Sequence, residues 1–553
     1  MSSRLASVSP PEPQPDDQGY KMPVTDYLAG PEWRELERTM AHGRPILAWK
    51  QRLRHVLDLC DLAPDRDDLD LIVQGDRRIS FSAFHRAVAA AAERLSRLGV
   101  ARGERVMMIL YNCPEILLLQ WAAFRIGAVP VFGNRWWSER EAAGAIARIR
   151  PALVVTDLDL SESMTGAEAP TRLHPADLSG WWHARVEGPV DDPRPHTHED
   201  DLAAIVFTAG STGAPKGVQL SHRILIWSQQ TFHILQNGRA PIPDGPGGQR
   251  VSLMTTPMFH NGALVTGIAN LIDGNRMVLL EGKFRPEEAL ALIERERITA
   301  WQAVPTMFMR LMQHPDFDRY DTDSLVAPSS GGMHISDTLL AQVRARLPAA
   351  ADRFASGYGM TEHAFITLTT LPQIVEKGGT VGKAIPGVEV RIADPDATGQ
   401  GELHVRSAAL MIGYWETGVQ PIDAEGWYAT GDLARIDPDG FIFITGRAKD
   451  MIIRGGENIS CAHVEAAMLE HPCVAEIAVV GTPDEQLGET VVAFVRLRPD
   501  TVATADELST FARERLAYFC VPREWRFERE PLPVLATGKL DKVALTARAA
   551  SVR

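Results

Sequence analysis

A repeated alternation of short apolar runs with longer amphipathic segments limits what this chain can fold into. Residues 106–110 and 129–132 are apolar runs of strand length. Residues 114–126 lie between them and have the pattern of a helix, with Pro114 suited to its first turn. Strands that alternate with helices in this way pair in parallel, with helices on the faces of the sheet. We therefore predict a mostly parallel α/β sheet.

The pattern changes twice towards the C-terminus. Residues 388–392, 401–406 and 441–445 are short alternating strands separated by turn residues, which predicts a small β-rich unit. Helix and strand signals return after residue 450 and continue for about 100 residues, the size of a small separate domain. We therefore expect a disordered segment over 1–20, a large domain over 21–449 and a small domain over 450–553.

Bulk composition excludes several classes of protein. The 553-residue chain carries a net charge of −14, whereas a nucleic-acid-binding surface is basic. The N-terminus lacks the apolar centre of a signal peptide, and the most apolar stretch, residues 107–132, is interrupted by polar and charged residues. The five cysteines include no C-x-x-C pair, which argues against a disulfide framework or a zinc site. We expect a cytoplasmic protein with no membrane span and no nucleic-acid partner.

The segment 207–217, FTAGSTGAPKG, is the clearest functional signal. Its glycines allow close backbone approach, its hydroxyl and N–H groups can donate to phosphate oxygens, and Lys216 adds a positive charge. The spacing differs from the G-x-x-x-x-G-K-[ST] pattern, because Pro215 precedes the lysine and Gly217 follows it. Alone, the segment is compatible with a phosphate-binding loop and, less well, with a flexible surface linker.

A second segment, residues 356–363 with the sequence SGYGMTEH, contains three side chains suited to a nucleotide. Tyr358 can stack on a base, Thr361 can donate to a phosphate, and Glu362 is a hard oxygen ligand of the kind that magnesium prefers. Taken alone, the segment is equally compatible with a surface loop whose glutamate is solvated.

Two later segments carry a carboxylate and two cations. Asp432 in YATGD is a natural partner for the two hydroxyls of a ribose, and Arg447 can add a donor to the same nucleoside. A turn aspartate and a surface arginine are the simpler explanation when each is considered singly. Lys539 in LATGKL, residues 535–540, would ordinarily be solvated, so its role depends on the other segments.

Together, these segments resemble the adenylate-forming superfamily, which includes acyl- and aryl-CoA synthetases, peptide-synthetase adenylation domains and beetle luciferases. The resemblance covers roughly residues 50–545 and keeps the order of the family's motifs. No single motif is specific, but the ordered set is. The matching segments are FTAGSTGAPKG, PMFHNGA at 257–263, SGYGMTE, GELHVRSAALMIGYW at 401–415, YATGD, GRAKDMIIRGGENIS at 446–460 and ATGK at 536–539.

The resemblance implies a fold and a nucleotide site. The expected fold is α/β, with a large N-terminal adenylation domain of parallel-sheet αβαβα subdomains plus a small β-barrel-like unit, and a small mobile α+β C-terminal domain that carries Lys539. ATP and Mg2+ are the implied nucleotide and metal, with Glu362 as the metal ligand. The residues implied to bind the nucleotide are Thr208, Ser211, Thr212, Gly213, Lys216, Gly331, Gly332, Tyr358, Gly359, Asp432 and Arg447.

The other implied roles concern the reaction and its two further substrates. Those assigned to catalysis are Lys539, Thr361, Glu362 and His260, and the hinge between the domains is Asp450. The acid pocket is expected to be formed by Phe232, Asn261, Gly262, Gln302, Val304, Ser330, Met360, His363 and Phe365. The acceptor side, where CoA would approach, is expected at Arg454, Gly455, Gly456, Glu457 and Asn458.

The implied reaction has two halves in one site. A carboxylate attacks the α-phosphorus of ATP and pyrophosphate leaves; because both partners are anionic, Lys539 and magnesium reduce their repulsion. The small domain covers the acyl-AMP against water, then rotates so that a thiol can attack it. Gln302 and His363 can contact a polar group of the acid, and Phe232 and Phe365 would narrow its cavity. A compact acid is therefore favoured over a long chain.

Two departures from the family pattern leave alternatives open. Cys461 follows GGENIS where many members have proline, beside the expected acceptor path, and a structural thiol is favoured over a nucleophile. Trp136 and Trp137 replace smaller residues and are expected to pack against neighbouring structure. We expect an AMP-forming acid–CoA ligase; the alternative is an adenylating enzyme that uses a carrier protein or an amine, or that activates an oxyanion such as nitrite. A monomer and a homodimer are equally compatible with the sequence.

Overall fold

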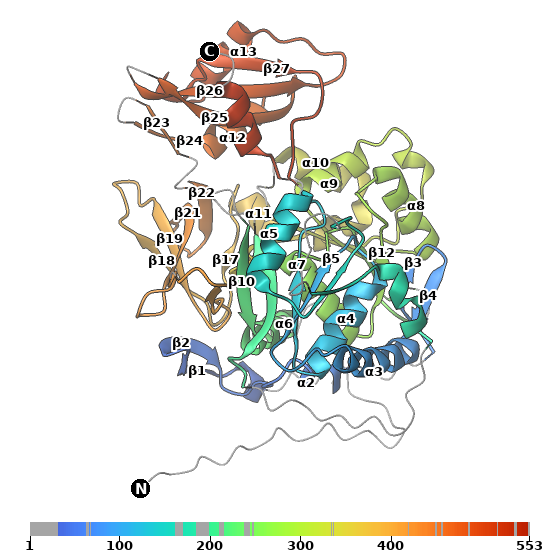
Figure 1. Ribbon diagram of the computed structural model, residues 1–553. Coiled ribbons are helices and arrows are strands. Elements are labelled where there is room, and N and C mark those ends of the chain that lie inside the picture. The colour runs from blue at the N-terminus through green and yellow to red at the C-terminus, as the bar shows by residue number, and fades with distance from the viewer. Residues whose placement is uncertain are drawn as a thin grey trace.

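The computed structural model shows a large N-terminal body and a smaller C-terminal unit that begins at β23 (Figure 1). This arrangement of parallel sheets and a small α+β unit confirms the predicted fold class. The expected disordered segment 1–20 lies outside the described residues and stays a prediction. Described are residues 31–550 apart from 62, 64–65, 67, 161–169, 184–197, 209–214, 237–243, 246–247, 333–334, 336, 419, 448–450, 455–456, 485–486, 517 and 536–538.

The first sheet of the large body has seven strands in the order β20-β10-β9-β6-β5-β7-β8. From β9 to β8 all neighbours are parallel, and the apolar residues of β5, β6 and β7 are buried, as in strands covered on both faces by helices. The apolar runs at 106–110 and 129–132 form β5 and β6. Bounds are Arg105–Ile109 for β5, Val129–Phe132 for β6, Leu153–Thr156 for β7, Thr171–Leu173 for β8, Leu202–Thr208 for β9, Lys216–Ser221 for β10 and Gly413–Tyr414 for β20.

The second sheet has nine strands in the order β17-β16-β15-β14-β13-β11-β12-β3-β4. Its six central strands, β15 to β3 in this order, are parallel, and antiparallel strands flank them. Bounds are Asp70–Gln74 for β3, Arg77–Ser80 for β4, Val251–Met254 for β11, Arg276–Leu279 for β12, Ala300–Ala303 for β13, Ala327–Gly331 for β14, Ala355–Met360 for β15, His363–Thr370 for β16 and Lys383–Ala384 for β17.

Helices cover the faces of both sheets. The N-cap of α3 is Ser80, because the N–H of Ala83 donates to Ser80 Oγ over 3.2 Å. Within the described residues, no helix has the length and apolarity that a membrane span requires. Bounds are Asp58–Asp61 for α2, Phe81–Arg97 for α3, Pro114–Arg125 for α4, Glu139–Ile149 for α5, His222–Gln236 for α6, Asn261–Ile272 for α7, Pro286–Glu296 for α8, Pro305–Met312 for α9, Asp337–Arg346 for α10 and Leu371–Glu376 for α11.

The predicted β-rich unit is an antiparallel sheet in the order β18-β19-β21-β22. Its register places Asp432 on β21 opposite Arg447 on β22. An N-terminal hairpin of β1 and β2 precedes the large sheets. Bounds are Leu36–Ala41 for β1, Arg44–Trp49 for β2, Glu389–Ala393 for β18, Gly401–Arg406 for β19, Tyr428–Ile436 for β21 and Ile442–Arg447 for β22.

The C-terminal unit has apolar cores of its own on both faces of one sheet. The strand order is β24-β23-β26-β25, and β27 pairs in parallel with β26. Residues of α12 and α13 pack with Ile477 and Val479 of β25, whereas α14 packs with Ala478 and Val480 on the other face. Bounds are Met451–Arg454 for β23, Glu457–Ser460 for β24, Val474–Asp484 for β25, Gly488–Leu497 for β26, Glu524–Glu528 for β27, Cys461–Leu469 for α12, Ala505–Arg513 for α13 and Lys542–Ala550 for α14.

Candidate active site

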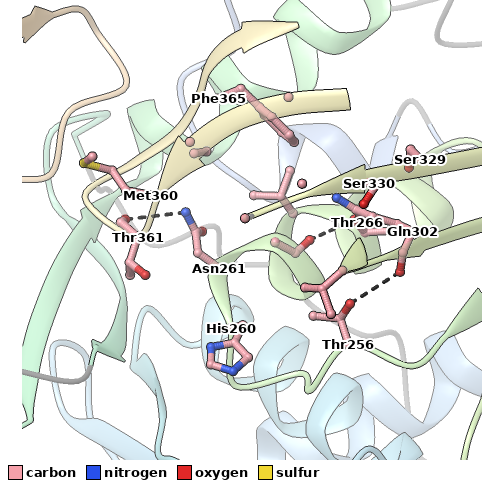
Figure 2. A pocket seen from close by; sticks show the side chains of 18 of the residues that line it. Thr256, His260, Asn261, Thr266, Gln302, Ser329, Ser330, Met360, Thr361 and Phe365 are labelled. Carbon is pink, nitrogen blue, oxygen red and sulfur yellow. Dashed lines mark hydrogen bonds between the residues drawn. The ribbon is translucent and has the colours of Figure 1, made fainter. Parts of the chain in front are cut away.

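A cavity of about 1510 Å³ lies at the carboxyl ends of β13, β14 and β15 and continues along one face of their sheet. This edge is where open α/β sheets bind ligands, because the strand ends leave a crevice between the loops. Figure 2 shows side chains from α7, β13, β14 and β16 around it. The predicted site residues that line the cavity are Thr208, Lys216, Phe232, His260, Asn261, Gly262, Gln302, Val304, Ser330, Gly331, Gly332, Gly359, Met360, Thr361, Glu362, Phe365, Arg447 and Lys539.

The glycine-rich segment joins β9 to β10, which pair in antiparallel fashion. Thr208 at the end of β9 is the register partner of Lys216 at the start of β10, so both lie at one edge of the cavity. The Lys216 Nζ is 5.1 Å from the centre of the Tyr414 ring, a cation–π arrangement that holds the ammonium at the cavity wall. The other predicted phosphate contacts, Ser211, Thr212 and Gly213, lie outside the described residues.

Glu362 lies in the turn between β15 and β16, where it lines the cavity. The Tyr414 hydroxyl donates to Glu362 Oε1 over 2.8 Å, and the hydroxyl oxygens of Tyr414 and Tyr428 are 3.2 Å apart. Burial, and then the charge of Glu362, raise the pKa of both phenols, so these groups stay protonated. Glu362 Oε2 accepts no hydrogen bond from a described residue, which leaves a hard oxygen ligand available to a cation.

Three side chains form a hydrogen-bonded group beside the cavity. Arg447 Nε donates to Asp432 Oδ1 over 2.8 Å, and the Tyr358 hydroxyl donates to Oδ2 over 2.5 Å. Asp432 is 3% exposed, and burial, followed by its negative charge, raises the pKa of Tyr358. Of the three, Arg447 alone lines the cavity; Tyr358 and Asp432 lie directly behind it.

Glycine is required where β15 approaches its neighbours β14 and β16 at the cavity. A Cβ at Gly331 would lie 2.9 Å from the carbonyl oxygen of Gly357. A Cβ at Gly359 would lie only 2.1 Å from the carbonyl oxygen of Ala364. Backbone atoms cannot yield as a flexible side chain can, so these strand ends present bare backbone to the cavity.

Lys539 reaches this cavity from the C-terminal unit. Its Cε lies 3.7 Å from the position that a Cβ would take at Gly332. Burial lowers the pKa of Lys539, and the positive charge of Arg447 lowers it further, while Asp432 and Glu362 oppose the shift. The ammonium therefore lies where the expected phosphate, metal and ribose contacts converge.

His260 is the N-cap residue of α7 and stands at the end of that helix beside Asn261 (Figure 2). Its Nε2 is buried and makes no hydrogen bond within the described residues. Burial, and then the charge of Lys539, lower the pKa of His260 to about 4, so the ring is neutral at neutral pH. Asn261 Nδ2 donates to the Thr361 carbonyl over 3.5 Å, which connects α7 to the turn that carries Glu362.

The expected acid pocket lies between α7 and the face of β13 and β14. The side chains of Thr266 on α7 and Gln302 on β13 are hydrogen-bonded, and the Thr256 hydroxyl donates to the Gln302 carbonyl over 3.4 Å (Figure 2). Phe232 on α6 and Phe365 on β16 add aromatic walls. Apolar walls with a few placed polar groups are typical of small-molecule sites.

Family comparison agrees with this geometry. Residues 61–415, more than half of the chain, match the family described as AMP-binding enzyme, and residues 463–539 match the C-terminal domain of AMP-binding enzymes. The chain belongs to the AMP-binding enzyme family. This confirms the resemblance to the adenylate-forming superfamily and its acyl-CoA synthetases. The second match ends on Lys539, so the lysine in the cavity belongs to the family's C-terminal domain.

The names of individual relatives describe different products, either an acyl-CoA thioester or an amide. A putative acyl-CoA synthetase of Bacillus subtilis is 29% identical over 534 residues, 88% of this chain and 94% of the relative. The 3-[(3aS,4S,7aS)-7a-methyl-1,5-dioxo-octahydro-1H-inden-4-yl]propanoyl:CoA ligase of Rhodococcus jostii is 31% identical over 512 residues, 86% and 95% of the two chains. The solved structure of an amide bond synthetase from Marinactinospora thermotolerans has a TM-score of 0.77 and 28% identity, over 90% of this chain and 99% of that one.

In this AMP-binding enzyme, Arg454 of the expected acceptor side does not line the cavity. It ends β23, and its Nη1 donates to the Phe519 carbonyl over 2.8 Å inside the C-terminal unit. The hairpin of β23 and β24 places Arg454 opposite Glu457. Gly455, Gly456 and the expected hinge residue Asp450 lie outside the described residues, as do the side chains of Glu457 and Asn458.

One prediction about the acid pocket needs correction. His363 does not line the cavity: it is fully buried, its Nε2 lies 2.6 Å from the Ser407 hydroxyl, and its ring packs edge-on against Trp227. Burial lowers its pKa to about 3, so it is a neutral packing residue. Ser330 borders the cavity, but its hydroxyl is buried, because alternation along β14 turns it to the face opposite Ser329.

The paired tryptophans pack as expected, and they also line the cavity. The Trp136 and Phe259 ring centres are 4.9 Å apart, as are those of Trp137 and Phe207, both in edge-on contacts. Both tryptophans are nonetheless part of the cavity wall. Packing and cavity lining are therefore not exclusive roles for these bulky rings.

Sequence reasoning missed Thr266, Ser329 and Tyr414. Thr266 lies four residues after Gly262 on α7, so helical periodicity places both on one face. Ser329 lies two residues before Gly331 on β14, so strand alternation places these two on one face. Tyr414 is part of the family motif over 401–415, but no local signal indicates its hydrogen bond to Glu362.

Proposed function

We propose that the protein is an ATP-dependent acid–CoA ligase. It activates a carboxylic acid as acyl-AMP with release of pyrophosphate, then transfers the acyl group to the thiol of CoA. The observation that carries the proposal is Lys539, whose half-buried side chain lies beside Gly332 in the cavity of an AMP-binding enzyme. A fixed cation at that point stabilises negative charge as it moves onto the leaving pyrophosphate.

The phosphates are assigned to the edge formed by Thr208 and Lys216, and magnesium to Glu362. Magnesium is usually held by one or two carboxylates together with substrate phosphates, which fits a single glutamate with one uncommitted oxygen. The described residues contain no group of three or more His, Cys, Asp or Glu side chains that would form an all-protein cage. When bound, the metal would neutralise phosphate charge at this edge.

The ribose is assigned to Asp432 and Arg447 and the base to the bare backbone of Gly331, Gly332 and Gly359. Asp432 already accepts one hydrogen bond on each oxygen, and each oxygen has a further lone pair for a ribose hydroxyl. The acid carboxylate is assigned to the space between Lys539 and the neutral ring of His260. A neutral imidazole there adds no second charge that would compete with Lys539 for the carboxylate.

A different acceptor is the second candidate, supported by the structural likeness to an amide bond synthetase. An amine or a carrier-protein thiol would then replace CoA in the second half-reaction. Cys461 does not act as an internal acceptor in this proposal, because it is 4% exposed within the core of the C-terminal unit. A small oxyanion such as nitrite is disfavoured, because the cavity of about 1510 Å³ extends far beyond the nucleotide contacts.

The test separates the two half-reactions. Purified protein receives ATP, magnesium and panels of acids, with and without CoA, and pyrophosphate, AMP and acyl-CoA are measured. We expect pyrophosphate with acid and acyl-CoA only when CoA is added. Adenylate without acyl-CoA from any acid would sink the CoA assignment, and amide formation with added amines would then favour the second candidate. Absence of pyrophosphate with every acid would contradict adenylation itself.

A further inference from the structure

The part of the cavity that runs beneath α7 has a floor of small side chains. Register places Ala300 on β13 beside Ala327 on β14, and Gly331 on β14 beside Gly357 on β15. Alternation along each strand directs Ala327, Ser329 and Gly331 to this same face. The four steps from Gly331 to Ala327 span about 13 Å at about 3.3 Å per residue. The cavity is therefore deep because the sheet face beneath it has almost no side-chain volume.

Polar groups interrupt this floor at one level. Gln302 on β13 is the register partner of Ser329 on β14, so the two side chains stand next to each other on the cavity face. Both are partly exposed and line the cavity, and Figure 2 shows them with Thr266 opposite. Gly331 lies at the end of the cavity where Lys539 enters. Gln302 and Ser329 lie two residues, or about 7 Å, further into the cavity.

The hydrogen bonds at this level are incomplete. The Thr266 hydroxyl lies 2.8 Å from the Gly262 carbonyl and also contacts the Gln302 side-chain amide. One hydroxyl has one hydrogen, so Thr266 either donates to the amide oxygen or donates to Gly262 and accepts from the amide nitrogen. In both cases the other amide atom of Gln302, like the Ser329 hydroxyl, bonds to no described residue. An apolar chain laid over them would leave both unsatisfied, because each would lose its hydrogen bonds to water without gaining a partner.

We infer that the acid carries a hydroxyl group on the part that lies beneath α7, about 7 Å along β14 from Gly331, and that Gln302 and Ser329 bind this hydroxyl. A hydroxyl both donates and accepts, so it satisfies Gln302 in either orientation of the amide and Ser329 at the same time. The inference rests on the proposed adenylation function and adds the substrate class, an oxygenated acid in place of a plain alkyl or aryl acid. Thr266 is a positioning residue, since it orients Gln302.

The test uses pairs of acids that differ by one hydroxyl. The pairs are 4-hydroxybenzoate and benzoate, 3-(4-hydroxyphenyl)propanoate and 3-phenylpropanoate, and 6-hydroxyhexanoate and hexanoate, with pyrophosphate release as the readout. We expect kcat/KM for the hydroxylated member of the best pair to exceed that of its partner by about 10-fold to 100-fold, since a site with unpaired polar groups rejects the analogue that lacks the hydroxyl.

Variants locate the preference. Gln302→Met keeps the side-chain volume and Ser329→Ala removes one hydroxyl; each should reduce the preference to within about threefold while leaving KM for ATP unchanged. Gln342→Met, on α10 outside the cavity wall, is the matched control and should keep the wild-type ratio. The inference is overturned if the enzyme activates both acids of every pair equally well, or if the preference survives Gln302→Met and Ser329→Ala. Either outcome leaves the proposed function standing. Failure to release pyrophosphate with any acid contradicts the proposed function instead.

Discussion

At the scale of single residues, the site depends on charges that are partly removed from water. Lys539 is half-buried beside Gly332, and burial lowers its pKa, so less solvent competes with a bound anion for its ammonium than at the protein surface. His260 has the opposite character: burial and the neighbouring cation keep it neutral. One fixed positive charge beside a neutral ring suits the reaction of a carboxylate with a phosphate, because the charge serves both anions.

Replacing Lys539 by alanine should separate the two half-reactions. We expect Lys539→Ala to slow adenylation by about 10²–10³-fold, because a preorganised charge at the leaving group is lost. Thioester formation from preformed acyl-AMP should stay within about threefold of wild type, measured as acyl-CoA release. Lys542→Ala, which removes a lysine paired with Glu465 at 2.7 Å, should leave both steps unchanged. Equal loss of both half-reactions in Lys539→Ala would contradict the assigned role.

At the scale of elements, β14 and β15 shape the site because they carry few large side chains at the cavity. Their ends carry glycines where a neighbouring carbonyl leaves no room for a Cβ. The same strands carry alanine and serine further down, which opens the cavity beneath α7. A sheet face with little side-chain volume thus serves the nucleotide at one end and the acid along its length.

Two glycine substitutions should therefore have opposite effects on the free energy of unfolding. Gly359→Ala places a Cβ 2.1 Å from the Ala364 carbonyl and should destabilise the fold by about 2–4 kcal/mol. Gly262→Ala, in the first turn of α7, meets nothing within 4 Å and should stabilise by about 0.5–1 kcal/mol. Urea unfolding measures both. Similar midpoints for the two variants would show that the backbone contact at Gly359 relaxes freely.

At the scale of the whole molecule, the C-terminal unit brings Lys539 to a cavity that the large body forms. Its separate apolar cores allow it to move as one piece. In this arrangement Lys539 is in the cavity, whereas Arg454 is bonded to Phe519 inside the C-terminal unit. The two half-reactions need different residues at one place, so we propose that the unit rotates between them about the hinge predicted at Asp450.

Restricting the hinge should arrest the enzyme in one half-reaction. Proline at position 450 fixes φ near −65° and limits rotation of the chain there. For Asp450→Pro we expect adenylation within about threefold of wild type and acyl-CoA formation from preformed acyl-AMP slower by about 100-fold. Asp450→Ala, which keeps the backbone free, is the control and should retain both steps. Full acyl-CoA formation by the proline variant would place the hinge elsewhere.

Acid should destabilise the folded protein through three buried histidines. Burial lowers the pKa of His222 and His363 to about 3 and that of His260 to about 4, below the value of 6.5 expected when unfolded. Their contribution to stability is complete above pH 6.5 and is lost as the pH falls towards 4, because the unfolded chain binds more protons. His233 has a raised pKa, so its contribution is present below pH 6.5 and is lost as pH rises through the folded value.

The free energy of unfolding, measured by urea titration, should accordingly fall between pH 7 and pH 5, with a limiting slope of about 4 kcal/mol per pH unit for three protons. His222→Asn and His363→Asn should each reduce this slope. Replacement of the exposed His198 should not change it. A midpoint independent of pH in this interval would show that the buried rings are protonated without loss of structure.

Local patterns in the sequence indicated most of the elements and the identity of most candidate residues. Strand and helix periodicity is a short-range property, so β6 and β19 were predicted with their observed bounds, while the strand expected at 106–110 is observed as β5 at Arg105–Ile109. The motif order implied the nucleotide contacts, and the structure brings Lys216, Glu362, Arg447 and Lys539 to one cavity from four separate parts of the chain.

By itself, the sequence determined the family, the α/β fold class and which residues carry charge or bare backbone, because these depend on local residue types and their order. Only the tertiary structure decided which way each side chain faces. The side chain of His363 points into the core. The Ser329 side chain faces the cavity, whereas the Ser330 hydroxyl is buried. The Tyr414 hydroxyl is hydrogen-bonded to Glu362. The physical reason is that facing depends on contacts between distant segments, which no local pattern in the chain encodes.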